Sequence, residues 1–224
     1  MDRRLPGDEN GLAPDRRLAP ARPTERRSLL LLALLTLLPF IALAIWARLY
    51  SPAPWEPDVL TAIALREGLF GDVFRLINNL GNLPLWSVLV AIVGAGIWLL
   101  RGVRAAILVG LSLASDLAAF AMKLVIERQR PDTAATEHFF GPESFAFPSG
   151  HVVRAVALIA VVVWVLAPPG LRFRLALASG LVAGAVMGYA RVALGVHWPT
   201  DALGGALLGL AWFGITTWAV APRD

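Results

Sequence analysis

Three short segments of the chain hold residues of the types that bind and transfer phosphate. They are 123–131, 148–151 and 191–201. Lys123, Arg130 and Arg191 supply three positive charges. Guanidinium groups match phosphate oxygens in pairs, and a lysine ammonium acts as a compact charge. The segments therefore predict a site for a phosphate-bearing ligand, provided that the fold brings them together.

The segment 148–151, Pro-Ser-Gly-His, suits the start of a helix. Ser149 can cap such a helix, which leaves the backbone amides of Gly150 and His151 at a positive helix end, where phosphate binds well. Gly150 also permits close approach of the backbone to a ligand. We expect this helix start to form part of the phosphate cradle.

Two histidines near these cations could carry the reaction. One of His151 and His197 could attack phosphorus as a nucleophile, and the other could protonate the leaving oxygen. Asp201 follows His197 by four residues, so its carboxylate could hold the His197 ring in one tautomer, as the acid does in a hydrolase triad. Phosphoryl transfer depends mainly on positioning and charge stabilisation. We therefore expect neither a metal nor a cofactor at this site.

Three further ionisable residues lie near the segments. Arg154 could contact a second phosphate or a lipid head group, or it could pair with Asp116 or Glu143. Asp116 lies seven residues before Lys123 and shares its helix face. We interpret it as a structural partner for an inward arginine rather than as a catalytic acid. His138 is interpreted mainly as a solvated loop residue, with contact to the substrate as the alternative.

Long apolar runs must position these residues. Hydrophobic residues make up 57% of the 224 positions, whereas soluble domains are nearer half apolar. Because the apolar residues lie in long runs, we expect an all-α, polytopic membrane protein with about six transmembrane helices in a single bundle. The expected spans are 29–47, 83–100, 105–126, 151–166, 175–189 and 201–220.

The composition of the remaining segments indicates which of them are tail, domain and connection. Residues 1–27 are polar and rich in Arg and Pro, so we expect a disordered cytoplasmic tail, followed by one membrane domain over 28–222. Within that domain, the mixed segment 51–82 could form short interfacial helices or a packed external loop, and it could cover the opening of the site. The chain has no cysteine, which excludes disulfides, thiolate metal ligands and cysteine nucleophiles.

The distribution of arginine predicts the orientation in the membrane. If the N-terminus is cytoplasmic, the tail, the turns at 101–104 and 167–174 and the C-terminus hold the expected cytoplasmic excess of arginine. The three phosphate-binding segments then share the non-cytoplasmic face. Basic residues beside apolar runs indicate contact with anionic membrane lipids and not with nucleic acid. The sequence indicates no particular oligomeric state.

The three segments resemble the motifs of the type 2 phosphatidic acid phosphatase family, which includes the vanadium-dependent haloperoxidases. The family pattern is Lys-x6-Arg-Pro, Pro-Ser-Gly-His and Ser-Arg-x5-His-x3-Asp, and each spacing recurs here, within a resemblance that covers roughly 85–220. Ala190 stands where the third motif usually has Ser. The change removes a hydroxyl but no charge or nucleophile, so we expect it to alter the shape of the pocket and not the reaction.

The resemblance implies a role for each matching residue. His197 resembles the nucleophile that becomes phosphohistidine, Asp201 its orienting acid, and His151 the general acid. The residues that correspond to the phosphate cradle are Lys123, Arg130, Ser149, Gly150 and Arg191.

The leading hypothesis is a metal-independent membrane phosphatase whose substrate is a lipid phosphate. Candidate substrates are phosphatidic acid, phosphatidylglycerol phosphate and undecaprenyl diphosphate. One alternative is a lipid phosphotransferase that uses the same phosphoenzyme. Another is a catalytically idle lipid-binding or transport protein, against which the intact His151, His197 and Asp201 argue. A haloperoxidase is disfavoured because those family members are soluble.

Overall fold

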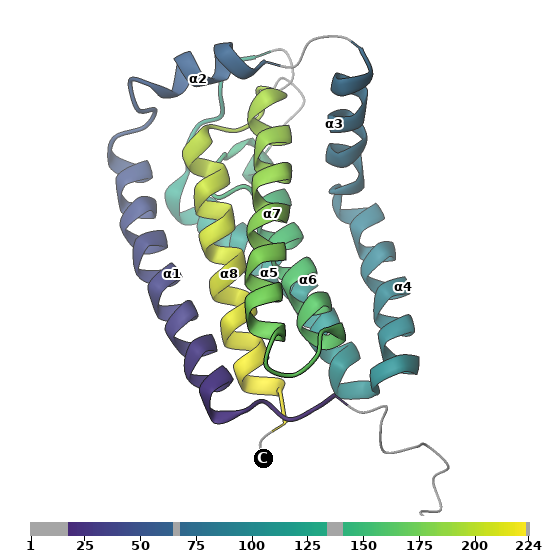
Figure 1. Ribbon diagram of the computed structural model, residues 1–224. Coiled ribbons are helices and arrows are strands. Elements are labelled where there is room, and N and C mark those ends of the chain that lie inside the picture. Colours follow the sequence, from purple (N-terminus) through teal and green to yellow (C-terminus); the bar gives the residue numbers. More distant parts are fainter. Residues whose placement is uncertain (1–17, 65–67, 134–140, 223–224) are drawn as a thin grey trace, which may run out of the picture.

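Long helices formed by the apolar runs make up a bundle in the computed structural model, which describes residues 18–64, 68–133 and 141–222 (Figure 1). The long helices are α1 (Pro23–Leu49), α4 (Leu83–Arg101), α5 (Val103–Ile126), α6 (Gly150–Leu166), α7 (Arg172–Ala193) and α8 (Pro199–Val220). The connections contain the short helices α2 (Glu56–Ile63) and α3 (Leu69–Leu80) and the 3-10 turn η3 (Gly141–Ser144). The all-helical prediction is confirmed.

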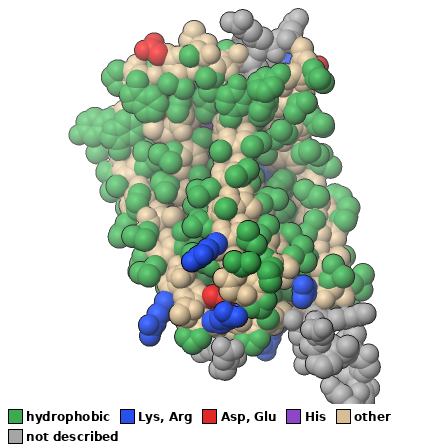
Figure 2. All heavy atoms as spheres, viewed as in Figure 1, with side chains coloured by type: hydrophobic (Ala, Val, Ile, Leu, Met, Phe, Trp, Pro, Cys, Tyr) green, Lys and Arg blue, Asp and Glu red, His purple; other side chains and the backbone are tan. Residues whose placement is uncertain are grey.

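The helices have the length and surface of a membrane bundle. By length and composition, five of them, α1, α4, α5, α7 and α8, could each cross a membrane within the described ranges. The sixth expected span, α6, has only 17 residues, or about 25 Å, against the ~30 Å of a bilayer core. Figure 2 shows hydrophobic side chains over the sides of the bundle, with Lys and Arg gathered toward the end at which α1 begins.

Helix α8 packs closely against both α1 and α6 because glycines face its neighbours. A Cβ atom at Gly209 would lie 2.8 Å from the carbonyl oxygen of Val153 in α6, and one at Gly214 would lie 2.8 Å from that of Leu29 in α1. Small residues permit such approaches between membrane helices, whose association depends on packing. Since α8 carries Asp201 in its first turn, this packing fixes the position of one predicted site residue.

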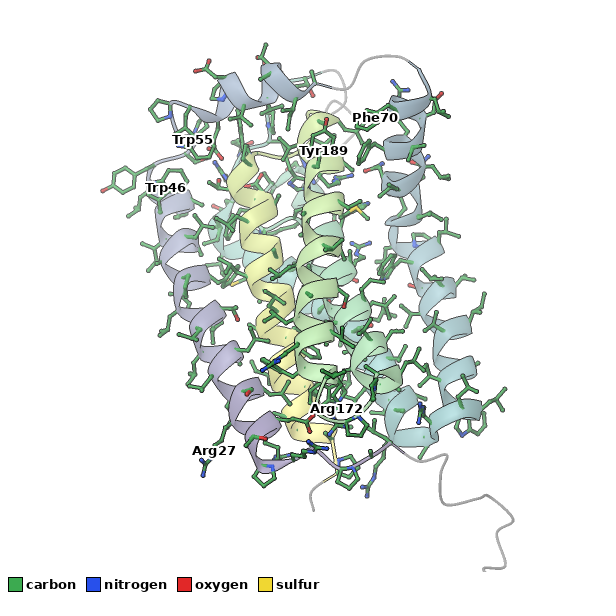
Figure 3. All side chains as sticks on the ribbon, in the orientation of Figure 1. Arg27, Trp46, Trp55, Phe70, Arg172 and Tyr189 are labelled. Atoms are coloured by element: carbon green, nitrogen blue, oxygen red, sulfur yellow. The ribbon has the colours of Figure 1, made fainter. Side chains whose placement is uncertain are left out.

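The start of α1 differs from the predicted boundary. The sequence predicts a disordered tail through residue 27, but α1 begins at Pro23. Glu25 is buried and forms an ion pair with Arg172 of α7 at 2.6 Å; Figure 3 shows Arg172 at the end of the bundle from which α1 starts. The tail prediction is therefore wrong for the residues just before 28, because their polar groups find partners on a distant helix. Residues 1–17 lie outside the described residues.

The segment 51–82 forms two helices that differ in direction. In Figure 1, α2 lies across one end of the bundle, whereas α3 stands in line with α4. Only Gly81 and Asn82 separate α3 from α4. Helix α3 packs on α7 through Phe74, whose ring centroid lies 4.9 Å from that of Tyr189. Of the two alternatives, the helical one is found, but α3 continues the line of a long helix instead of lying flat.

Candidate active site

A cavity of about 790 Å³ opens where the ends of α5 and α7 meet the start of α6. Eight of the predicted site residues line it: Asp116, Lys123, Arg130, Gly150, His151, Arg154, Arg191 and His197. Ser149 and Asp201 are buried directly behind this lining, and His138 lies outside the described residues. Three segments that are far apart in the sequence thus meet around one space.

A tight turn after α7 places His197. The N–H of Gly195 donates to the carbonyl of Val192 at 2.8 Å, and the N–H of Val196 donates to that of Arg191 at 3.2 Å. This pair of bonds is the Schellman pattern, which favours glycine because the residue directly after the C-cap has positive φ; here that residue is Gly195, with φ +72°. The turn brings His197 to the cavity beside Arg191, which explains the fixed spacing between the two residues.

The contacts of His197 assign its tautomer. Its Nδ1 lies 3.4 Å from Oδ2 of Asp201, and its Nε2 lies 3.1 Å from Nη1 of Arg130. A guanidinium group can only donate, so Nε2 must accept, and the ring proton belongs on Nδ1, toward the carboxylate. The same Oδ2 accepts the backbone N–H of Trp198 at 2.8 Å. The lone pair of Nε2 consequently points to the cavity, where it accepts from Arg130.

Burial and nearby cations keep His197 neutral. The residue lies in the turn between α7 and α8 and is 1% exposed. Burial, followed by the charges of Arg130 and Arg191, lowers its pKa well below the ordinary value of 6.5. Burial also lowers the pKa of Arg130, to about 10, so that guanidinium remains charged at neutral pH. A neutral imidazole among cations is suited to attack an electrophile that carries negative charge.

This arrangement predicts that His197 stays neutral well into the acidic range. In protein labelled with ¹⁵N-histidine, its ring nitrogens should keep neutral-imidazole shifts below about pH 6.5, where an ordinary histidine is half protonated. His197→Gln identifies the signals by their loss. Below that pH the unfolded chain takes up a proton that the folded chain does not, so stability should fall as the pH drops through this window. Imidazolium shifts for His197 at pH 7 would contradict the assignment.

Arg191 is a buried cation without a carboxylate partner among the described residues. It is 3% exposed, and no carboxylate of the described residues forms an ion pair with it. Its Nη1 donates to the amide oxygen of Asn78, and its Nε has no acceptor in the same part of the chain. An uncompensated buried charge costs several kcal/mol. The site is therefore suited to receive an anion at Arg191.

The other cations of the cavity have partners. Nζ of Lys123 lies 2.7 Å from Oε2 of Glu143. Arg154 pairs with Asp116 at 2.9 Å, which is one of the partners that the sequence suggested for it. Arg154 also donates to the carbonyl of Gly150, in the first turn of its own helix, and to that of Gly81 between α3 and α4. Its role as a ligand for a second phosphate finds no support, because each of its nitrogens already has an acceptor. Arg154 instead joins α5, α6 and the junction of α3 with α4.

Ser149 occupies the N-cap position of α6 but does not act as the expected cap. Its hydroxyl makes no capping bond, and its Oγ is buried without a hydrogen-bond partner within the described ranges. Its backbone N–H instead donates to the carbonyl of Asp201 at 3.1 Å, so the start of α6 docks on α8. As the first residues of α6, Gly150 and His151 still have N–H groups that the helix cannot satisfy.

The junction of α3 and α4 reaches the site, which the sequence analysis did not foresee. Asn78 contacts Arg191, and Oδ1 of Asn82 lies 3.3 Å from Nε2 of His151. A Cβ atom at Gly81 would collide with the His151 ring, so only glycine allows this approach. The available signal was the polar sequence Asn-Asn-Leu-Gly-Asn directly before an apolar run.

Two further buried residues that the sequence analysis did not single out stand behind the His197–Asp201 pair. Arg128 pairs with Asp201 at 2.5 Å and with Glu56 of α2 at 2.6 Å. The spacing Arg-x-Arg at 128–130 was the available signal, because alternate residues of an extended chain point to the same side.

The chain is similar to known proteins in both sequence and structure. Phosphatidylglycerophosphatase B of Bacillus subtilis (strain 168) is 35% identical over 158 residues, which cover 68% of this chain and 76% of that protein. The crystal structure of the first transmembrane PAP2 type phosphatidylglycerolphosphate phosphatase, from Bacillus subtilis, matches with a TM-score of 0.70 at 29% identity. That match covers 83% of this chain and 94% of the other.

The match to a transmembrane structure, together with the apolar helices, identifies an integral membrane protein. The family model of the PAP2 superfamily matches residues 104–224, a region that includes the segments 123–131, 148–151 and 191–201. Since this model covers more than half of the chain and a relative of 35% identity covers 68% of it, the chain belongs to the PAP2 superfamily.

Proposed function

We propose that this membrane phosphatase hydrolyses lipid phosphates through a phosphohistidine at His197. The observation that carries the proposal is Arg191, a buried cation without a carboxylate partner in the described residues, beside a neutral histidine. Phosphate supplies the missing negative charge, and its phosphorus then lies within reach of Nε2. The roles of Asp201 as orienting acid and His151 as general acid belong to the same proposal.

The reaction has two steps. Nε2 of His197 attacks phosphorus while the bond between phosphorus and the lipid oxygen breaks, and His151, in its imidazolium form, gives a proton to that oxygen and becomes neutral. Asn82 accepts a hydrogen bond from Nε2 of His151, which places the proton on that nitrogen. Water then attacks phosphorus as His151 accepts a proton, the P–N bond breaks, and inorganic phosphate leaves. The positive charge of Arg130 and Arg191 stabilises the phosphoryl oxygens in both steps.

The apolar part of the cavity supports a lipid substrate. Besides the charged residues, the lining includes Leu83 and Pro84 of α4 and Leu117 and Phe120 of α5. Leu83, Leu117 and Phe120 are also exposed on the outside of the bundle. A hydrocarbon chain attached to the phosphate can therefore leave the cavity between α4 and α5 and remain in the bilayer, where its transfer to water would be unfavourable.

The position of the arginines supports a site on the non-cytoplasmic side. Arg26, Arg27, Arg101 and Arg104 lie where α1 and α5 begin or α4 ends, and Figure 3 shows Arg27 and Arg172 at that same end. An arginine excess of this kind is typical of the cytoplasmic side. The cavity lies toward the opposite ends of α5 and α7, so both termini are cytoplasmic and the site faces away from the cytoplasm.

Phosphate release from a panel of lipids in the presence of EDTA tests the function. We expect the fastest phosphate release from phosphatidylglycerol phosphate, since both relatives are named for that activity. Phosphatidic acid and undecaprenyl diphosphate are the other lipids of the panel. EDTA should leave the rate unchanged, because protein cations supply the positive charge. Loss of activity in EDTA with recovery in Mg²⁺ would contradict metal independence. Absence of release from every lipid would contradict the phosphatase.

The same assay separates hydrolysis from transfer. Addition of an alcohol acceptor such as diacylglycerol should leave inorganic phosphate as the main product, whereas a phosphotransferase would convert the acceptor into its phosphate ester.

A further inference from the structure

Arg128 forms the centre of a buried ion cluster behind the cavity. The residue is 2% exposed, and the carboxylates of Glu56 and Asp201 are both 0% exposed. Nη1 lies 2.5 Å from Oδ1 of Asp201 and 2.6 Å from Oγ1 of Thr200, and Nη2 lies 2.6 Å from Oε2 of Glu56. The third nitrogen, Nε, contacts the hydroxyl of Ser51. Each nitrogen of the guanidinium group therefore faces at least one acceptor fixed by the fold.

The end of α5 directs this arginine inward. Glu127 follows the last residue of α5 and has φ +51°, so the helix stops there and the chain continues in an extended form. Arg128 and Arg130 then point to the same side. Arg128 reaches Asp201, while Arg130 reaches Nε2 of His197. The same short segment after α5 therefore places Arg128 at Asp201 and Arg130 at His197.

The bond to Arg128 determines how Asp201 faces His197. One carboxylate oxygen, Oδ1, accepts from Arg128, and the other, Oδ2, accepts the N–H of Trp198 and faces Nδ1 of His197. Without the guanidinium group the carboxylate could rotate, and its buried charge would have no cation beside it. Glu56 in turn holds Arg128 and is itself fixed by the N–H and hydroxyl of Thr200.

We propose that Arg128 is a positioning residue of the reaction, which keeps Asp201 ionised and directed at Nδ1 of His197. Glu56 anchors Arg128 and so connects α2 to the site. The inference rests on the proposed function, since Arg128 acts through Asp201 and His197. Arg128 is not among the residues that line the large cavity, so its loss should lower kcat and leave substrate binding almost unchanged.

The test removes Arg128 without leaving two carboxylates unpaired. Arg128→Gln alone would bury two negative charges without a cation, which is strongly destabilising. The double variant Arg128→Gln/Glu56→Gln keeps the net charge of the cluster at the wild-type value, because one cation and one anion are lost together. Its kcat should fall about 10–100-fold, a typical cost of losing an orienting partner, with KM within about threefold. Glu56→Gln alone retains Arg128 and should lose much less.

Combination with Asp201→Asn shows whether Arg128 acts through Asp201. In that background the double variant should cause no further fall in kcat, because the carboxylate that it positions is absent. A further fall by the same factor would indicate general structural damage and would overturn the inference. So would a wild-type kcat in the double variant when Asp201→Asn is inactive. Failure of the wild-type protein to release phosphate would instead overturn the proposed function.

The buried pair at the opposite end of the bundle is the matched control. Arg172→Gln/Glu25→Gln removes an ion pair of similar length and burial, far from the cavity. It should lower the melting temperature in detergent but leave kcat unchanged. An equal fall in kcat would show that the loss of any buried pair slows the enzyme, and would also overturn the inference.

Discussion

Replacement of His197 by alanine should abolish phosphate release while the protein still binds phosphate or vanadate. The variant loses the nitrogen that forms the bond to phosphorus, and no neighbouring group can replace it in the first step. Loss of a nucleophile in a hydrolase lowers kcat by about 10⁴-fold or more. The cations that hold the phosphate, including Arg130 and Arg191, remain in place. Binding should therefore survive where turnover does not.

A comparison of the two histidines makes this prediction specific. With an aryl phosphate labelled on phosphorus, the leaving group needs little protonation. His151→Ala should then accumulate a phosphoenzyme, because water attack lacks its base. His197→Ala should form none. Rapid quenching at neutral or alkaline pH measures both, and a thermal shift with vanadate confirms that each variant is folded. A phosphoenzyme in His197→Ala, or turnover near the wild-type rate, would refute the assignment of the nucleophile.

Replacement of Arg191 by glutamine should have the second-largest effect and an unusual signature in stability. The value of kcat/KM should fall about 10³-fold, as expected for an arginine that stabilises phosphoryl charge in the transition state. The ligand-free protein should melt at the same temperature or higher, because the variant removes a buried cation that has no carboxylate partner among the described residues. Stabilisation by vanadate should be lost.

Arg172 provides the contrast for this second prediction. It is buried at the opposite end of the bundle, but its guanidinium group is neutralised by Glu25. Arg172→Gln should therefore lower the melting temperature of the ligand-free protein and keep stabilisation by vanadate. Melting curves in detergent, with and without vanadate, separate the two cases. If Arg191→Gln destabilised the ligand-free protein as much as Arg172→Gln does, Arg191 would be a structural residue.

The residues that line the cavity could be predicted largely from sequence because local geometry sets their spacing. The Schellman turn at Gly195 determines how far His197 stands from Arg191. The first turn of α8 places Asp201 four residues later, beside the histidine ring. Apolar runs long enough to cross a bilayer likewise predict helices without reference to the rest of the chain. These features depend on contacts between residues that are close in sequence.

Partners distant in the chain required the tertiary structure. Glu56 meets Thr200 across 144 positions and Arg128 across 72, and nothing in either local sequence specifies the other. The same holds for the contact of Asn78 with Arg191 and for the ion pair of Glu25 with Arg172. Glu25 lies in α1, although composition assigns it to a disordered tail. Buried polar groups must find partners, but which partner is available depends on how the helices pack. The sequence thus determined the chemical groups of the site, and the packing of α2, α3 and α8 decided what surrounds and orients them.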